Sequence, residues 1–106
     1  MVNFNYNLIN MDKLSTRTKT LLLQGASTLG NFTQGFYYIE ERLTAREADI
    51  AQPFCEWLDR EIGGASSHNI DSLYAAYKNP NNPELTKRAN EIAEKIKSIK
   101  ILTNRC

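Results

Sequence analysis

The end of the chain carries the clearest structural signal in the sequence, a helix whose start and buried side can both be read directly. Asn82 can accept a hydrogen bond from a free amide of the first turn, Pro83 suits the first helical position, and Glu84 complements the positive helix end. Apolar side chains then recur every three or four residues, at Leu85, Ala89, Ile92, Ile96 and Ile99. This spacing predicts a helix over 83–100 with one side that other helices must cover.

The cover for this apolar stripe is expected within the same chain. The stripe spans about two heptads, whereas a coiled coil with another chain is persuasive only over three or four. The helix expected from Leu14 to Leu43 and a face formed by Phe54, Leu58 and Ile62 are the predicted cover.

The first of three further helices is predicted over 12–43, where apolar or small residues recur every three or four positions. Gly25, Gly30 and Gly35 count against it, because each glycine disfavours a helix interior by ~1 kcal/mol. A kink or break near 25–31 therefore remains an alternative to a continuous helix.

Two shorter helices are predicted between these long ones. Thr44 and Glu47 have the spacing of a capping box, so a helix should run over 45–62, with a kink at Pro53 and an end at Gly63. A third helix is expected over 68–78, capped by Ser66 or Ser67 and ended by the run 79–83, which is rich in asparagine and proline.

The first residues show a different pattern, in which apolar side chains alternate with asparagines. This period of two is typical of an extended strand, and it places Val2, Phe4, Tyr6 and Leu8 on one side of an arm over 1–11. The arm could pair with the segment 99–102, pair with the arm of a second subunit, lie in a groove, or remain a free tail. We expect docking, because each of these side chains gains about 1.5–3 kcal/mol on full burial.

The fold class that follows is all-α, a compact bundle of about four helices in a single domain over 12–106, preceded by the extended arm. A length of 106 residues and an apolar content of 42% suit one soluble domain. The longest aliphatic run is Leu21–Leu23, and the first residues lack the basic segment and apolar run of a secretory signal, so neither secretion nor a membrane span is expected. Cys55 and Cys106 make no disulfide framework, so a cytoplasmic location without membrane contact is expected.

Charge is unevenly distributed although the formal net charge is only +1. Residues 40–61 contain seven acidic and three basic side chains, a local net charge of −4, and residues 84–106 contain six basic and three acidic ones, a local net charge of +3. One interpretation is two solvated helix faces that attract each other within the monomer or across a dimer. The other interpretation is a docking surface for a charged partner.

No grouping of residues indicates catalysis or a bound cofactor. The single histidine, His68, has no second metal ligand at a suitable spacing, and the glycine-containing run 63–67 lacks the lysine and the preceding strand of a phosphate loop. The acidic pair Glu40 and Glu41 is typical of a helix surface. The sequence therefore predicts no catalytic, cofactor-binding or metal residues, no cofactor and no enzyme.

The segment Leu43–Asp49 is similar to the opening of the helix-turn-helix domain of quorum-sensing-type transcription regulators. The resemblance implies a DNA-binding regulator with a recognition helix over 69–78. That helix offers Asn69, Ser72 and one lysine beside Asp71, and a long glycine-rich turn precedes it, whereas groove readers carry several polar or basic side chains after a tight turn. Shared capping chemistry explains the seven residues equally well.

The predicted function is that of a small non-enzymatic interaction or regulatory protein, acting as a homodimer or on another protein. Aromatic side chains beside the apolar stripes suit such contacts. The predicted surface therefore combines the arm residues Val2, Phe4, Tyr6 and Leu8 with Tyr37, Tyr38 and Trp57. The alternatives are a helix-turn-helix-like DNA-binding regulator, and a helical domain that binds a small molecule between its aromatic side chains.

Overall fold

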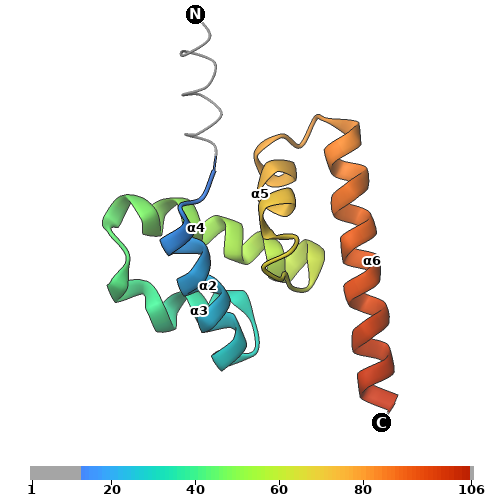
Figure 1. The fold of residues 1–106 in the computed structure, drawn as a ribbon, viewed down its shortest axis with the longest axis horizontal. Coiled ribbons are helices and arrows are strands. Elements are labelled where there is room, and N and C mark those ends of the chain that lie inside the picture. Colours follow the sequence, from blue (N-terminus) through green and yellow to red (C-terminus); the bar gives the residue numbers. More distant parts are fainter. Residues whose placement is uncertain (1–12, 106) are drawn as a thin grey trace, which may run out of the picture.

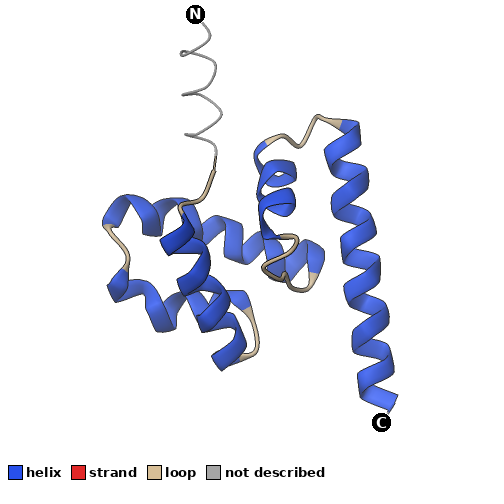
Figure 2. Cartoon of the chain, viewed as in Figure 1, coloured by secondary structure: helices blue, strands red, loops and turns tan. Residues whose placement is uncertain are grey.

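Helices make up all the regular structure of the described chain. The computed structural model describes the backbone of residues 13–105 and the side chains of residues 13–99. Within this part, and with no strand in Figure 2, the elements are α2 (Thr16–Leu29), α3 (Phe32–Ile39), the 3₁₀ turn η1 (Glu40–Arg42), α4 (Ala45–Trp57), the π-helical turn η2 (Leu58–Ile62), α5 (Ile70–Lys78) and α6 (Pro83–Arg105). The all-α prediction is confirmed, and the predicted arm lies outside the described residues.

The prediction of one continuous helix over 12–43 is wrong, because the chain turns back at Gly30 and Asn31. Gly30 ends α2 with φ 91°, a left-handed conformation that glycine adopts without strain, and its amide donates to the carbonyl oxygen of Ala26. The side chain of Asn31 then accepts a hydrogen bond from the amide of Gln34, at 2.8 Å, and starts α3. The break lies within residues 25–31, the region for which the glycines made a kink or break an alternative to a continuous helix.

The glycines Gly25 and Gly35 explain why α2 and α3 pack so closely as a hairpin. A Cβ atom on Gly25 would lie 2.9 Å from the carbonyl carbon of Gly35 and closer still to its oxygen. A Cβ atom on Gly35 would lie 2.8 Å from the Cα atom of Ala26 and closer still to its amide nitrogen. The two backbones therefore touch where any larger residue would hold them apart.

The second predicted helix is confirmed, with one change at its end. Thr44 and Glu47 form the capping box that starts α4, and Pro53 lies inside the helix. The last turn widens into η2, where the amide of Gly63 donates to the carbonyl oxygen of Leu58 at 2.6 Å. Gly63 ends the helix with φ 95°, as the two consecutive glycines predicted.

The carboxylate of Asp59, in η2, fixes the start of α3. It accepts hydrogen bonds from the amides of Phe32 and Thr33, at 3.0 and 2.7 Å, and from the hydroxyl of Thr33, at 2.5 Å. A carboxylate at a helix N-terminus is favoured because it satisfies amides that have no partner within the helix. Asp59 thereby connects the α2–α3 hairpin to the end of α4.

Replacement of Asp59 by alanine is expected to lower the free energy of unfolding by roughly 2 kcal/mol, since hydrogen bonds to a charged group are worth more than neutral ones. Urea unfolding followed by circular dichroism measures the loss. Asp49→Ala is the matched control, because Asp49 is an exposed aspartate on α4, and its loss should stay within about 0.5 kcal/mol. Equal losses in the two variants would contradict the role of Asp59.

The starts of the last two helices differ in how well they were predicted. The side chain of Asn82 accepts hydrogen bonds from the amides of Glu84 and Leu85, at 3.0 and 3.2 Å, which confirms the predicted start of α6. The predicted start of the third helix is wrong by two residues, because α5 begins after Asn69. The amide of Ser66 instead donates to the side chain of Asn69, at 2.7 Å, so the serine belongs to the preceding loop.

The apolar stripe of α6 is covered by α5 and η2, and only in part. Figure 1 shows α6 beside α5 at one end of the molecule, with the α2–α3 hairpin towards the other end. The predicted cover by a first long helix is therefore wrong, whereas the part expected from Ile62 is present in η2. Ala89 is buried, Leu85, Ile92 and Ile96 are half-buried, and Ile99 is 60% exposed.

Candidate functional site

The uncovered part of the α6 stripe forms one wall of a surface groove of about 530 Å³. The opposite wall is the loop between η2 and α5, together with the first turn of α5. The groove is lined by Gly63, Gly64, Ala65, Ser66, His68, Asn69, Ser72, Arg88, Ile92, Lys95, Ile96 and Ile99. Its size and mainly apolar lining are those of a binding groove.

The loop wall leaves the groove open because its residues are small and its backbone is held in place. Gly64 has φ 150°, and a Cβ atom there would meet the Cγ2 atom of Ile96 at 3.8 Å. The amide of Ile70 donates to the carbonyl oxygen of Ser66 at 3.0 Å, and the amide of His68 donates to the Ser66 hydroxyl at 3.3 Å. The wall is therefore formed before any partner binds, which lowers the entropic cost of binding.

Two cations, Arg88 and Lys95, lie on the α6 side of the groove and are exposed. The ion pairs among the described side chains are Arg17–Glu47, Lys19–Asp71 and Arg60–Glu61, so none of them joins α6 to the acidic segment 40–61. Direct pairing of the two charged segments within the monomer, one of the two interpretations of the sequence, is thus not found in this part of the chain. The cations of the groove remain available to a partner.

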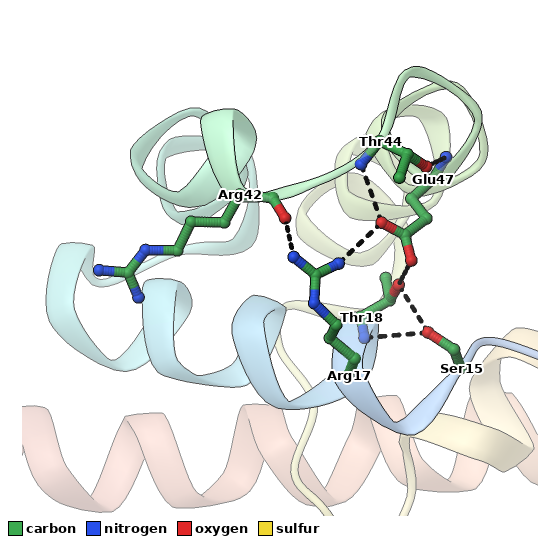
Figure 3. Close-up of polar contacts among 6 residues, drawn as sticks. All are labelled: Ser15, Arg17, Thr18, Arg42, Thr44 and Glu47. Carbon is green, nitrogen blue, oxygen red and sulfur yellow. Dashed lines mark hydrogen bonds and ion pairs between the residues drawn. The ribbon is translucent and has the colours of Figure 1, made fainter.

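A second polar cluster joins the N-terminal ends of α2 and α4 (Figure 3). The guanidinium of Arg17 donates to the Oε1 atom of Glu47 at 3.0 Å, and also to the carbonyl oxygen of Arg42. The same Oε1 atom accepts the amide of Thr44 at 2.9 Å, and the Thr44 hydroxyl accepts the amide of Glu47 at 3.1 Å. One carboxylate therefore completes the cap of α4 and holds α2 against it.

The other oxygen of Glu47 extends this cluster into the protein. The buried hydroxyl of Thr18 donates to Oε2 at 3.4 Å and accepts a hydrogen bond from the Ser15 hydroxyl at 2.9 Å. The backbone amide of Thr44, helped by the charge of Arg17, lowers the pKa of Glu47, and desolvation opposes the shift. A general acid needs a raised pKa, so this ionised carboxylate is suited to structure rather than to proton donation.

The aromatic residues of the predicted interaction surface separate into two groups. Tyr37 and Tyr38 lie on α3 and are 49% and 57% exposed, and the side chain of Gln52 donates to the Tyr37 hydroxyl at 3.0 Å. Trp57 instead packs in an aromatic cluster, with its ring stacked on that of Phe54 at 6.0 Å and tilted against that of Tyr77 at 5.4 Å. Val2, Phe4, Tyr6 and Leu8 lie outside the described residues, so the role of the arm stays a prediction.

The groove itself was missed by the sequence reasoning, because its isoleucines were assigned to the core. Two signals in the sequence point to it. Arg88 and Lys95 are one heptad apart beside the stripe, where a helix packed on that side would meet two charges. The small residues of the run 63–67 precede a helix and can fill little space against α6.

The thiol of Cys55 is buried in α4, and burial raises its pKa to about 12, with smaller contributions from the charges of Asp59 and Glu56. A thiol that stays protonated is a poor nucleophile and a poor metal ligand. Over the described residues, no three or more side chains of His, Cys, Asp or Glu are placed to hold a metal ion. The helices of this part of the chain also include none that is long and apolar enough to cross a membrane.

The raised pKa of Cys55 predicts a loss of stability at alkaline pH. Above the ordinary thiol pKa of 9.0 the unfolded chain releases this proton while the folded chain retains it up to about 12, so the free energy of unfolding should fall as the pH rises through that window. Urea unfolding of Cys106→Ser and of Cys106→Ser with Cys55→Ala measures the effect with one thiol and with none. An identical pH dependence of the two variants would contradict it.

Comparisons of the chain with protein-family models, with curated proteins and with solved structures found no match.

Proposed function

We propose that this chain is a non-enzymatic interaction protein and that the groove beside α6 is its docking surface for another polypeptide. A second copy of the chain or another protein could supply that polypeptide, and a cytoplasmic location is part of the same proposal. The observation that carries the proposal is the graded exposure of the α6 stripe, from buried Ala89 to Ile99 at 60% exposure.

The stripe supports this function because the described residues leave part of its apolar side chains exposed along the groove. Isolated exposed apolar residues are normal on protein surfaces, whereas a contiguous apolar surface with a polar rim is typical of a binding site. Ile92, Ile96 and Ile99 share one groove with Arg88 and Lys95. This combination of an apolar floor and a charged rim is that of a protein interface.

The described residues give less support to the DNA-binding alternative. The helix expected to read DNA, α5, has Asp71 and Lys78 as its charged side chains, and Asp71 is paired with Lys19 at 3.1 Å. Phosphate contacts need several cations on one surface. The alternative of a small molecule among aromatic side chains also gains little, since the cluster around Phe54 is filled by its own rings.

Native mass spectrometry of the protein isolated from its own host tests the proposal. We expect the unchanged chain to carry a bound polypeptide, either a second copy or another protein. Ile99→Glu should abolish this complex, because it places a charge on the apolar floor. Lys97→Glu is the matched control, since Lys97 is an exposed α6 side chain outside the groove, and it should leave the complex intact.

Two outcomes would overturn the proposal. One is an unchanged chain that is monomeric and carries no polypeptide. The other is a complex that survives in Ile99→Glu, which would place the docking surface elsewhere. A retained small molecule in place of a polypeptide would favour the ligand-binding alternative.

A further inference from the structure

We propose that the occupant of the groove is an amphipathic helix of a partner protein, with acidic side chains beside its apolar stripe. This inference rests on the proposed function and names the chemistry of the partner. Three properties of the groove carry it: the spacing of its isoleucines, the sign of its charge, and the effect of that charge on a second copy of α6.

The spacing of the isoleucines favours a helix as the occupant. Ile92, Ile96 and Ile99 are four and three residues apart, so they form a straight apolar row that rises about 10 Å along α6. Helices dock in such grooves by inserting side chains with the same spacing. The facing loop wall, with Gly64 and Ala65, has no large side chains and so adds little bulk beside the isoleucine row.

The charge of the groove favours acidic side chains on that helix. Arg88 and Lys95 are seven residues apart and so lie on the same flank of the isoleucine row. The groove has no carboxylate among its described lining residues, and neither cation takes part in an ion pair among the described side chains. Glutamates on the docked helix would meet both cations, and the closed contact would exclude water and strengthen the attraction.

The same cations disfavour a second copy of α6 as the occupant. In an antiparallel pair of α6 helices centred between residues 91 and 92, Arg88 of each copy would lie opposite Lys95 of the other. Like charges on the flank of a helix pair select against that pair. The two cations therefore disfavour a homodimer that pairs its α6 stripes in this register.

The probes for this inference are two designed helical peptides that share one leucine stripe with spacings of four and three residues. One peptide carries glutamates on both flanks of the stripe, and the other carries lysines. Each is titrated into the full chain labelled with ¹⁵N at low salt. We expect the glutamate peptide to bind roughly tenfold more tightly, because two favourable ion pairs replace two like-charge contacts, and to shift the amide signals of Gly64, Ile96 and Ile99.

Charge reversal in the groove provides the matched comparison. The double variant Arg88→Glu with Lys95→Glu should prefer the lysine peptide, whereas Lys97→Glu should keep the preference for the glutamate peptide. Raising the salt concentration should weaken the preferred complex in each case.

Three results would overturn the inference: equal binding of the two peptides, binding of neither, or signals in the groove that shift with protein concentration alone, which would identify a second copy as the occupant. These results are distinct from failure of the proposed function. A natural complex that requires Ile99, combined with no charge preference between the peptides, would retain the docking surface and reject the acidic partner.

Discussion

Gly25→Ala is expected to lower the free energy of unfolding by about 3 kcal/mol or more, even though alanine is the better helix former. The added methyl group would lie 2.9 Å from the carbonyl carbon of Gly35, and backbone cannot rotate away as a flexible side chain can. The α2–α3 hairpin would have to open, and the buried Leu22 and Phe36 would lose their packing. Urea unfolding followed by circular dichroism measures the loss.

Gly30→Ala separates this steric effect from the ordinary effect of replacing a glycine. Nothing lies within 4 Å of a Cβ atom at Gly30, where φ is 91°, so the expected loss is only the strain of a left-handed alanine, about 1–2 kcal/mol. Gly25→Ala should lower the free energy of unfolding by more than Gly30→Ala does. The reverse order would contradict the close contact between α2 and α3.

Phe54→Ala is expected to lower the free energy of unfolding by roughly 3–5 kcal/mol, the range for removal of a fully buried aromatic ring. Phe54 is 0% exposed. Its ring lies 5.0 Å from that of Tyr74, 5.4 Å from that of Tyr77 and 6.0 Å from that of Trp57. The cavity would lie beside the chain's single tryptophan, so the fluorescence of the folded protein should change as well.

Tyr38→Ala is the control for the loss of an aromatic side chain. Tyr38 is 57% exposed, so the expected loss is within about 0.5 kcal/mol and the fluorescence of Trp57 should not change. Phe54→Leu should lower the free energy of unfolding by less than Phe54→Ala does, because leucine fills part of the cavity. Equal losses for Phe54→Ala and Tyr38→Ala would contradict the buried aromatic cluster.

The features that the sequence predicted well are local ones. The caps of α4 and α6 involve residues two or three positions apart, Thr44 with Glu47 and Asn82 with Glu84, and short-range chemistry of this kind is independent of the rest of the fold. The apolar spacing likewise predicted the buried face of α4 and η2, where Phe54, Cys55 and Leu58 are all fully buried.

The features that the sequence could not predict depend on contacts between distant residues. Asp59 caps a helix that begins 27 residues earlier, and no spacing rule connects a carboxylate to amides so far away. The extent of burial along α6 is a second case. The spacing of three and four residues places Ile99 and Ala89 on the same apolar stripe of α6. The length of α5 and the position of η2 determine where along α6 the burial of that stripe ends.

The hairpin of α2 and α3 lies between these two cases. The glycines near residue 30 predicted a possible break, and Gly30 with Asn31 supplies the end of one helix and the cap of the next. Apolar or small residues recur every three or four positions across the break, because both helices have a face towards the same core. Periodicity alone therefore favoured one helix over two.

The far end of the α6 stripe is surface that the described residues of the chain leave exposed, and the free energy of unfolding of Ile99→Gln tests this most directly. Glutamine removes the apolar side chain without adding charge. We predict a change within about 0.5 kcal/mol, against a loss of roughly 2 kcal/mol or more for Ala89→Gln on the same stripe, where the residue is 4% exposed. A loss at Ile99 as large as that at Ala89 would show that the isolated chain already covers the groove, and would contradict the account.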